Sequence, residues 1–379
     1  MNAHPRSRAA AAVLTVAVMS AVLGAGLSSS WSQLSRQRGL VAAERAGVAY
    51  LEPLTALVGA LTTAGSGAAR GEPLDAGPLH AAAAEVAAAD TAHGALLGTG
   101  PRWSELRRRI GALTGGPGGY QDLRDAAGLA TELATQVGDA SHLVLDAELD
   151  VYYLTDAGLR LPAVMSGAAR VADLVALPPG TGAAASGDAD ERAAAVAVAR
   201  YEVAVAVAAI STGLRKSAQN TTLLSTGTDL TGQQDAFQTA VDTLTPPALV
   251  RDLSGQVTPA GSADAAARVG RAAAGLAAAI WDRLDTLLAD RQAGLVRQQR
   301  LVMGGAATVP AGALVLLWLF APGRRSHAAD DDAGGDAGGT EPEAPQISLI
   351  DARDLLGAEE LVHVGRAVRP RPREHDGAR

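Results

Sequence analysis

The residues whose types and spacing could support chemistry are a tyrosine pair and the aspartates beside it. Asp150, Tyr152, Tyr153 and Asp156 fall within two turns of one predicted helix. Because tyrosine combines an apolar ring with a hydrogen-bonding hydroxyl, the group predicts a ligand-binding patch between helices. The alternative is a structural role, which is the commoner one for these residue types: one tyrosine ring fills the core while the aspartates cap the helix or face solvent.

Recognisable motifs for catalysis and metal binding are absent from the sequence. None of the seven histidines is spaced from another histidine or a carboxylate motif as zinc ligands are. The chain has no cysteine, which excludes disulfides, thiolate zinc sites, iron–sulfur clusters and a cysteine nucleophile. No G-x-S-x-G, Walker A or dinucleotide-binding fingerprint occurs. We therefore expect no enzyme, no metal and no cofactor.

Composition narrows the class of protein further. Of 379 residues, 48% are hydrophobic, only 3% are aromatic and 43 are glycine, so small side chains dominate. This hydrophobicity excludes a wholly disordered chain. The formal net charge of −8 excludes a strongly basic nucleic-acid-binding protein, so no nucleic acid is expected as a partner.

Two uncharged stretches predict membrane helices. Residues 9–27 follow Arg6 and Arg8 and approach the length needed to cross the ~30 Å hydrocarbon core of a bilayer. A cleaved signal peptide is the alternative for this segment, but the apolar run exceeds the ~7–15 residues usual for a signal peptide. Residues 301–320 form the second stretch, for which a buried core helix is the alternative.

The basic residues predict the orientation of these spans. Arg6 and Arg8 precede the first span, and Arg324 and Arg325 follow the second, as expected for cytoplasmic flanks. We therefore predict a multi-pass protein of the cell membrane with both termini in the cytoplasm. Its parts are listed in chain order: a cytoplasmic N-terminus at 1–8, a transmembrane helix at 9–27, an extracytoplasmic domain at 28–300, a second transmembrane helix at 301–320 and a largely disordered cytoplasmic tail at 321–379.

Residues 28–300 are predicted to be entirely helical. Apolar residues at three-, four- and seven-residue steps mark one buried helix face: Leu34, Val41, Val48, Leu51, Leu54, Val58 and Leu61. Pro53 should kink this helix without ending it, and a turn is expected at 65–78. Further helices are expected at 79–97, 103–113, 120–145, 149–177, 191–224, 233–244 and 263–300. The fold class is therefore all-α, a membrane-anchored elongated up–down bundle between two transmembrane helices.

One segment resembles a known kind of sensor. The run HLVLDAELDVYYLTDAGLRLPAVM at 142–165 is similar to a signature in the extracytoplasmic helical-bundle sensor region of bacterial methyl-accepting chemotaxis receptors, diguanylate cyclases and histidine kinases. The shared features are listed here: Leu145-Asp146, Asp150, Tyr152-Tyr153, Asp156 and Leu161-Pro162. Segments 44–61 and 281–300 resemble the first and last helices of such regions. HAMP and output modules, which usually follow in that family, have no counterpart in residues 321–379.

The resemblance implies a two-pass membrane sensor. Its bundle would bind a small molecule or an envelope partner, with Asp150, Tyr152, Tyr153 and Asp156 as ligand-binding residues, and it would signal through a separate output protein. The expected partners are the lipid bilayer, such a ligand, a separate signalling protein and a second copy in a homodimer. The alternative is a non-signalling envelope scaffold or interaction protein with a degenerate sensor bundle.

Overall fold

The computed structural model describes residues 5–114, 119–146, 148–176, 189–220, 227–245 and 259–320. Within these ranges, the described side chains exclude those of 5–17, 20, 23, 189, 220, 227–229, 259–260 and 305–320. The elements are α1 (Pro5–Ala69), α2 (Ala76–Leu97), α3 (Gly100–Thr114), α4 (Tyr120–Ala140), η1 (Leu143–Leu145), α5 (Leu149–Ala176), α6 (Ala189–Asn220), α7 (Gly227–Leu244) and α9 (Pro259–Phe320). These ranges contain no strand, so the predicted all-α class is confirmed.

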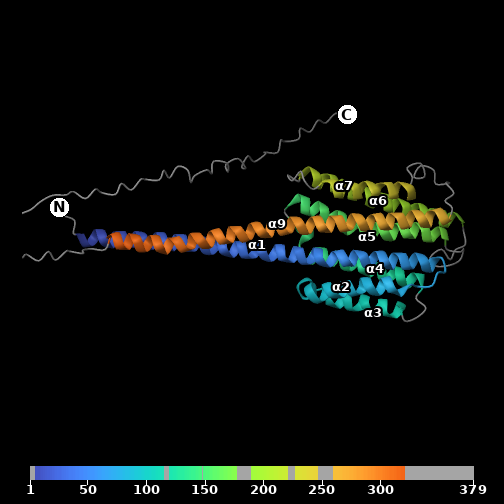
Figure 1. Ribbon diagram of the computed structural model, residues 1–379, viewed down its shortest axis with the longest axis horizontal. Helices are drawn as coiled ribbons and strands as arrows, with labels where there is room; N and C mark the ends of the chain where they lie inside the picture. Colours follow the sequence, from blue (N-terminus) through green and yellow to red (C-terminus); the bar gives the residue numbers. More distant parts are fainter. Residues whose placement is uncertain are drawn as a thin grey trace, which may run out of the picture. The chain divides into compact units, whose positions relative to one another are not determined.

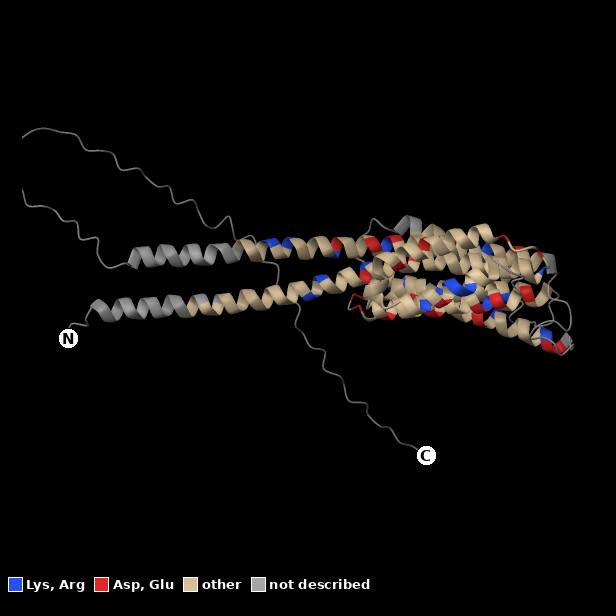
Figure 2. Ribbon diagram, turned by 90° about the horizontal axis from the view of Figure 1, so that it is seen from below, with Lys and Arg blue, Asp and Glu red and all other residues tan. Residues whose placement is uncertain are grey.

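The two long helices α1 and α9 pack against each other and extend past the shorter helices (Figures 1 and 2). α1 continues through Pro53, as predicted, and all seven apolar residues of its predicted face are buried. Where the pair leaves the shorter helices, Arg45 donates to Asp285 at 2.9 and 3.3 Å and to Gln292 at 2.9 Å. Arg38 hydrogen-bonds Gln299 farther along the pair. These polar links keep α1 and α9 in register.

The shorter helices pack around α1 and α9 on two sides (Figure 1). On one side, α2 packs on α1 and α3 packs on α4. On the other side, α6 packs on α5 and α7 packs on α9. Helices α1, α4, α5 and α9 therefore supply most of the shared core, and any cavity among them is lined by segments distant in sequence.

Trp281 of α9 packs against small residues of both α1 and α5. Trp281 of α9 is 1% exposed, and its indole Nε1 lies 3.4 Å from the hydroxyl of Thr55 on α1. A methyl group on Gly158 of α5 would lie 2.6 Å from the Trp281 ring. Because packed atoms do not approach so closely, glycine at 158 is required for the ring to lie against the α5 backbone.

Several predicted boundaries differ from the structure: α2, α3, α7 and α9 begin three to six residues earlier than expected. Two other differences have a packing reason. The turn expected at 65–78 begins later, because α1 continues to Ala69 and its buried Gly65 approaches Leu123 of α4. The helix expected at 120–145 ends at Ala140. His142 then adopts a left-handed backbone with φ of 65°, and Ser141 fits closely against Gly47 of α1. Sequence periodicity carries no information about either tertiary contact.

The predicted membrane segments lie at the ends of the long helices. Residues 9–27 belong to α1 and 301–320 to α9, but many of their side chains lie outside the described residues. Among the side chains that the structure describes, one segment is long and apolar enough to cross a membrane: residues 190–219 of α6, which include an 18-residue window with a mean hydropathy of 1.8. The predicted tail at 321–379 lies outside the described residues.

Helix α6 has two apolar faces. One face packs on α5, where Val203, Val207 and Ile210 are buried. The other leaves Val198, Tyr201 and Val205 between 51% and 66% exposed. The high hydropathy of α6 therefore reflects an exposed apolar stripe as well as a packed face.

Candidate functional site

The aspartates predicted as ligand-binding residues are engaged within their own helix. Asp150 lies in the first turn of α5, and its carboxylate accepts the backbone N–H of Val151 at 2.9 Å. Asp156 accepts two hydrogen bonds from the Arg160 guanidinium, each of 2.9 Å. These interactions agree with the helix-capping and solvated roles given as the alternative above.

The tyrosine pair connects α5 with α6. The Tyr152 and Tyr153 rings meet edge to face with centroids 5.2 Å apart, and the Lys216 ammonium of α6 lies 5.1 Å from the centre of the Tyr153 ring. Tyr152 is 38% exposed and Tyr153 is half-buried. None of the four predicted residues lines either of the cavities described next, so this ligand-binding patch stays a prediction.

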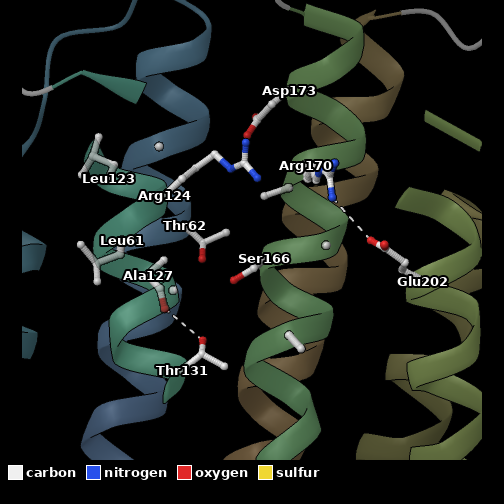
Figure 3. A pocket seen from close by; sticks show the side chains of 15 residues that line it. Leu61, Thr62, Leu123, Arg124, Ala127, Thr131, Ser166, Arg170, Asp173 and Glu202 are labelled. Atoms are coloured by element: carbon white, nitrogen blue, oxygen red, sulfur yellow. Dashed lines mark hydrogen bonds and ion pairs between the residues drawn. The ribbon is translucent and has the colours of Figure 1, made fainter. Parts of the chain in front are cut away.

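A cavity of about 360 Å³ lies between α1, α4 and α5 and reaches α6 at one rim; we call it the α4–α5 cavity (Figure 3). Buried apolar residues, including Leu61, Leu123 and Ala127, form its floor, whereas Arg124 and Glu202 lie at its exposed rim. Its full lining is Leu61, Thr62, Gly65, Leu123, Arg124, Ala127, Gly128, Thr131, Ala163, Ser166, Gly167, Ala169, Arg170, Asp173 and Glu202. An apolar floor with a few convergent polar groups is typical of small-molecule sites.

Four charged side chains line the α4–α5 cavity. Arg170 of α5 and Glu202 of α6 form an ion pair at 3.5 Å. Arg124 of α4 and Asp173 of α5, one helical turn from Arg170, point toward each other (Figure 3). Two positive and two negative groups therefore surround a space large enough for a small molecule.

Asp173 is the unusual member of this group, because it is only 4% exposed. Burial raises the pKa of its carboxyl above the ordinary value. The nearby hydroxyls of Ser66 and Tyr120 and the positive charges of Arg124 and Arg70 oppose that shift. The same desolvation, together with the Asp173 charge, raises the pKa of Tyr120 to about 12. A buried carboxylate beside a cavity is a recognised indicator of a binding site.

A second cavity, of about 510 Å³, lies on the other side of α1, between α1, α5 and α9. Alanines dominate its lining, and Arg70 and Arg271 are its charged members. Thr62 and Ala169 line both cavities, so the contact of α1 with α5 separates them.

A buried charged cluster lies where α1 and α9 leave the shorter helices. Arg291 of α9 donates to Asp146 at 2.8 Å and lies 3.6 Å from Glu44 of α1 and 3.5 Å from Glu148. The side chains of Asp146 and Glu44 are 1% and 5% exposed. Burial, followed by the negative charge of Asp146, raises the pKa of Glu44 to about 7, and Arg291 opposes the shift.

In the part of the chain that the structure describes, no group of three or more histidine, aspartate or glutamate side chains is arranged to hold a metal ion. Comparisons with family models, curated proteins and solved structures gave no match for this chain. The resemblance in residues 142–165 therefore stays an expectation.

Sequence reasoning did not select Arg124, Arg170 or Asp173. One signal was present: Asp173 is a lone charge within the apolar run VADLVA at 171–176, on a helix with many buried residues. A carboxylate in such a setting is costly to bury unless it has a partner or a function. Arg124 and Glu202 have charged residues within two positions in the sequence, and Arg170 lies among alanine and valine at a helix position where a long side chain can reach solvent.

Proposed function

We propose that this chain is a two-pass bacterial membrane sensor whose helical bundle lies outside the cytoplasm. It binds a small molecule in the α4–α5 cavity and passes a displacement of α1 against α9 to a separate signalling protein. Residues 9–27 and 301–320 are its membrane spans, and the lipid bilayer is its constant partner.

Exposed apolar side chains near the outer ends of α1 and α9 support the membrane assignment. Val18, Met19 and Val22 of α1 are 54%, 58% and 64% exposed, and Leu301 and Met303 of α9 are 76% and 52% exposed. Large apolar residues at such positions are costly in water and favourable in a bilayer.

The observation that carries the sensor proposal is that α1 both lines the cavity and contains the predicted first span. Leu61, Thr62 and Gly65 of α1 contribute to the α4–α5 cavity, and the same helix continues without interruption to residues 9–27. A helix that is displaced at one end transmits the movement along its axis as a rigid element.

Ligand binding is tested on the full-length chain in lipid nanodiscs. Thermal unfolding is followed with amino acids, organic acids, nitrogen oxyanions and cell-wall fragments, because a ligand at about 100 times its Kd adds about 2.7 kcal/mol to stability. Gly128 lines the cavity, and nothing lies within 4 Å of a Cβ at this position, so Gly128→Leu should obstruct the cavity without a steric clash. Gly111→Leu on α3 is the matched control, because its Cβ also meets open space but lies outside the cavity.

Displacement of the long helices is measured separately. Spin labels at Gln37→Cys and Gln298→Cys, both exposed, report the distance between α1 and α9 without interference, because the chain has no other cysteine. A ligand that stabilises the wild type but not Gly128→Leu, and that changes this distance, supports the sensor. If no compound in the panel changes the stability or this distance, the sensor proposal is contradicted.

The alternative, a non-signalling envelope scaffold, is favoured by the exposed stripe of Val198, Tyr201 and Val205 on α6. Apolar residues at three- and four-residue steps on an exposed helix face suit a partner helix. If no ligand acts and Tyr201→Glu removes a defined envelope protein that otherwise copurifies with the chain, the scaffold becomes the better account.

A further inference from the structure

The charges around the α4–α5 cavity restrict the chemistry of its ligand. Arg124 and Arg170 contribute two positive charges, and Asp173 and Glu202 contribute two negative charges. A dianion would meet two repelling carboxylates, and a polycation would meet two repelling guanidinium groups. A molecule that carries one charge of each sign matches this balanced lining better than either.

The two charged groups at one end of the cavity are arranged to receive both ends of such a molecule. Arg124 and Asp173 point toward each other (Figure 3), yet no direct ion pair within 4 Å joins them among the described residues. The Arg124 guanidinium instead lies 5.5 Å from the Tyr120 ring centre and 3.4 Å from the Gln121 side-chain oxygen. Neither charge is therefore neutralised by a salt bridge to the other, and the Asp173 carboxylate faces the hydroxyls of Ser66 and Tyr120.

The rest of the cavity suits a short aliphatic group. Leu61, Leu123 and Ala127 are buried in its floor. Thr62 and Thr131 donate their hydroxyl hydrogens to the backbone oxygens of Val58 and Ala127, which leaves the hydroxyl oxygens as acceptors. The volume of about 360 Å³ is at the small end of the range for ligand pockets.

We propose that the α4–α5 cavity binds a small zwitterion of the α-amino acid class, with its carboxylate on Arg124, its ammonium group on Asp173 and a short aliphatic side chain on the apolar floor. This inference names the ligand class for the site proposed above and rests on that proposed function. The ion pair of Arg170 with Glu202 adds one charge of each sign to the lining, which disfavours ligands of high net charge.

The experiment pairs changes in the ligand with changes in the protein. Full-length chain in nanodiscs is titrated by calorimetry with alanine, valine, leucine, N-acetylalanine, alanine amide, succinate and inorganic phosphate. We expect one or more of the three amino acids to bind, and removal of either charge from that ligand to weaken binding about 10- to 100-fold, as expected for a lost charge-assisted hydrogen bond.

Two substitutions assign each charge to its partner. Asp173→Asn should weaken binding of the free amino acid but leave binding of its N-acetyl form unchanged, because that form has no ammonium group. Arg124→Gln should weaken binding of the free amino acid but leave binding of its amide unchanged, because the amide has no carboxylate. Arg102→Gln, at an exposed position of α3 outside the cavity, should alter neither affinity.

The outcomes separate this inference from the proposed function. If succinate or phosphate binds, Gly128→Leu abolishes that binding and no amino acid binds, the ligand class is wrong while the cavity remains the site. If amino acids bind equally well to Gly128→Leu, or if Asp173→Asn weakens all ligands alike, the assignment of charges in the cavity is wrong. If none of the probes and none of the broader panel binds, both proposals fall.

Discussion

Arg291 of α9 donates a hydrogen bond of 2.8 Å to Asp146, a residue 145 positions earlier in the chain whose side chain is 1% exposed. Glu44 of α1 lies 3.6 Å from the same guanidinium. One cation therefore joins α9, α1 and the segment between η1 and α5 at the level where the two long helices leave the bundle. Relative movement of α1 and α9 would have to rearrange this cluster.

Stability should fall as the pH rises through the titration range of Glu44. The pKa of Glu44 is about 7 in the folded protein and 4.5, the ordinary value, in the unfolded chain. Between pH 4.5 and pH 7, unfolding therefore releases the proton that Glu44 holds in the folded state. Between pH 4.5 and pH 7 the free energy of unfolding should decrease by about 1.36 kcal/mol per pH unit, to a total of up to about 3 kcal/mol. Above pH 7 it should level off. Glu44→Gln should remove this decrease, which denaturant unfolding at several pH values measures. An unchanged pH profile in the variant would contradict the assignment.

Loss of the central cation should destabilise the bundle. Arg291→Met leaves the buried Asp146 carboxylate without its charged donor, at an expected cost of about 2–3 kcal/mol at pH 7. Arg297→Met on the same helix is the control, because Arg297 is exposed and its guanidinium hydrogen-bonds the backbone oxygen of Ala293 on its own helix. Equal stabilities of the two variants in chemical denaturation would show that the cluster has no role in folding.

Gly158→Ala and Gly128→Ala should have opposite effects on stability. A methyl group at 158 would lie 2.6 Å from the buried Trp281 ring, whereas a methyl group at 128 meets nothing within 4 Å. We expect a net loss of about 1–2 kcal/mol for Gly158→Ala, and a gain of about 0.5–1 kcal/mol for Gly128→Ala from helix propensity. Thermal unfolding of both variants measures the difference, and a stable Gly158→Ala would mean that Trp281 can move.

Single cysteines should report the proposed membrane orientation. In intact cells, Thr91→Cys, at an exposed position of α2, should react with a membrane-impermeant maleimide. Ser7→Cys should react only after the membrane is permeabilised. The reverse pattern would invert the topology, and loss of the Ser7→Cys label from the mature chain would identify residues 9–27 as part of a cleaved signal peptide.

The tyrosine patch and the α4–α5 cavity make different predictions for ligand binding. If the cavity is the site, Tyr152→Ala and Tyr153→Ala should leave any ligand-dependent increase in melting temperature unchanged, because neither residue lines it. If either variant folds and loses that increase while Gly128→Leu retains it, the patch predicted from the sequence is the binding site.

The sequence by itself determined the helical class and most helix positions. The spacing of Leu34, Val41 and Val48 predicted a buried face on α1, and all three side chains are buried. The uninterrupted helix through Pro53 and the continuity of α9 to Phe320 were also expected. Such features were predictable because helix periodicity and turn residues act over a few positions along the chain.

Only the tertiary structure decided which residues share a site. Thr62, Arg124, Asp173 and Glu202 come from four helices and line one cavity, and Glu44, Asp146 and Arg291 form one cluster. The early end of α4 likewise depends on the fit of Ser141 against Gly47. Distances between such residues follow from how alanine-rich helices pack, and small side chains allow many pairings that local spacing does not distinguish.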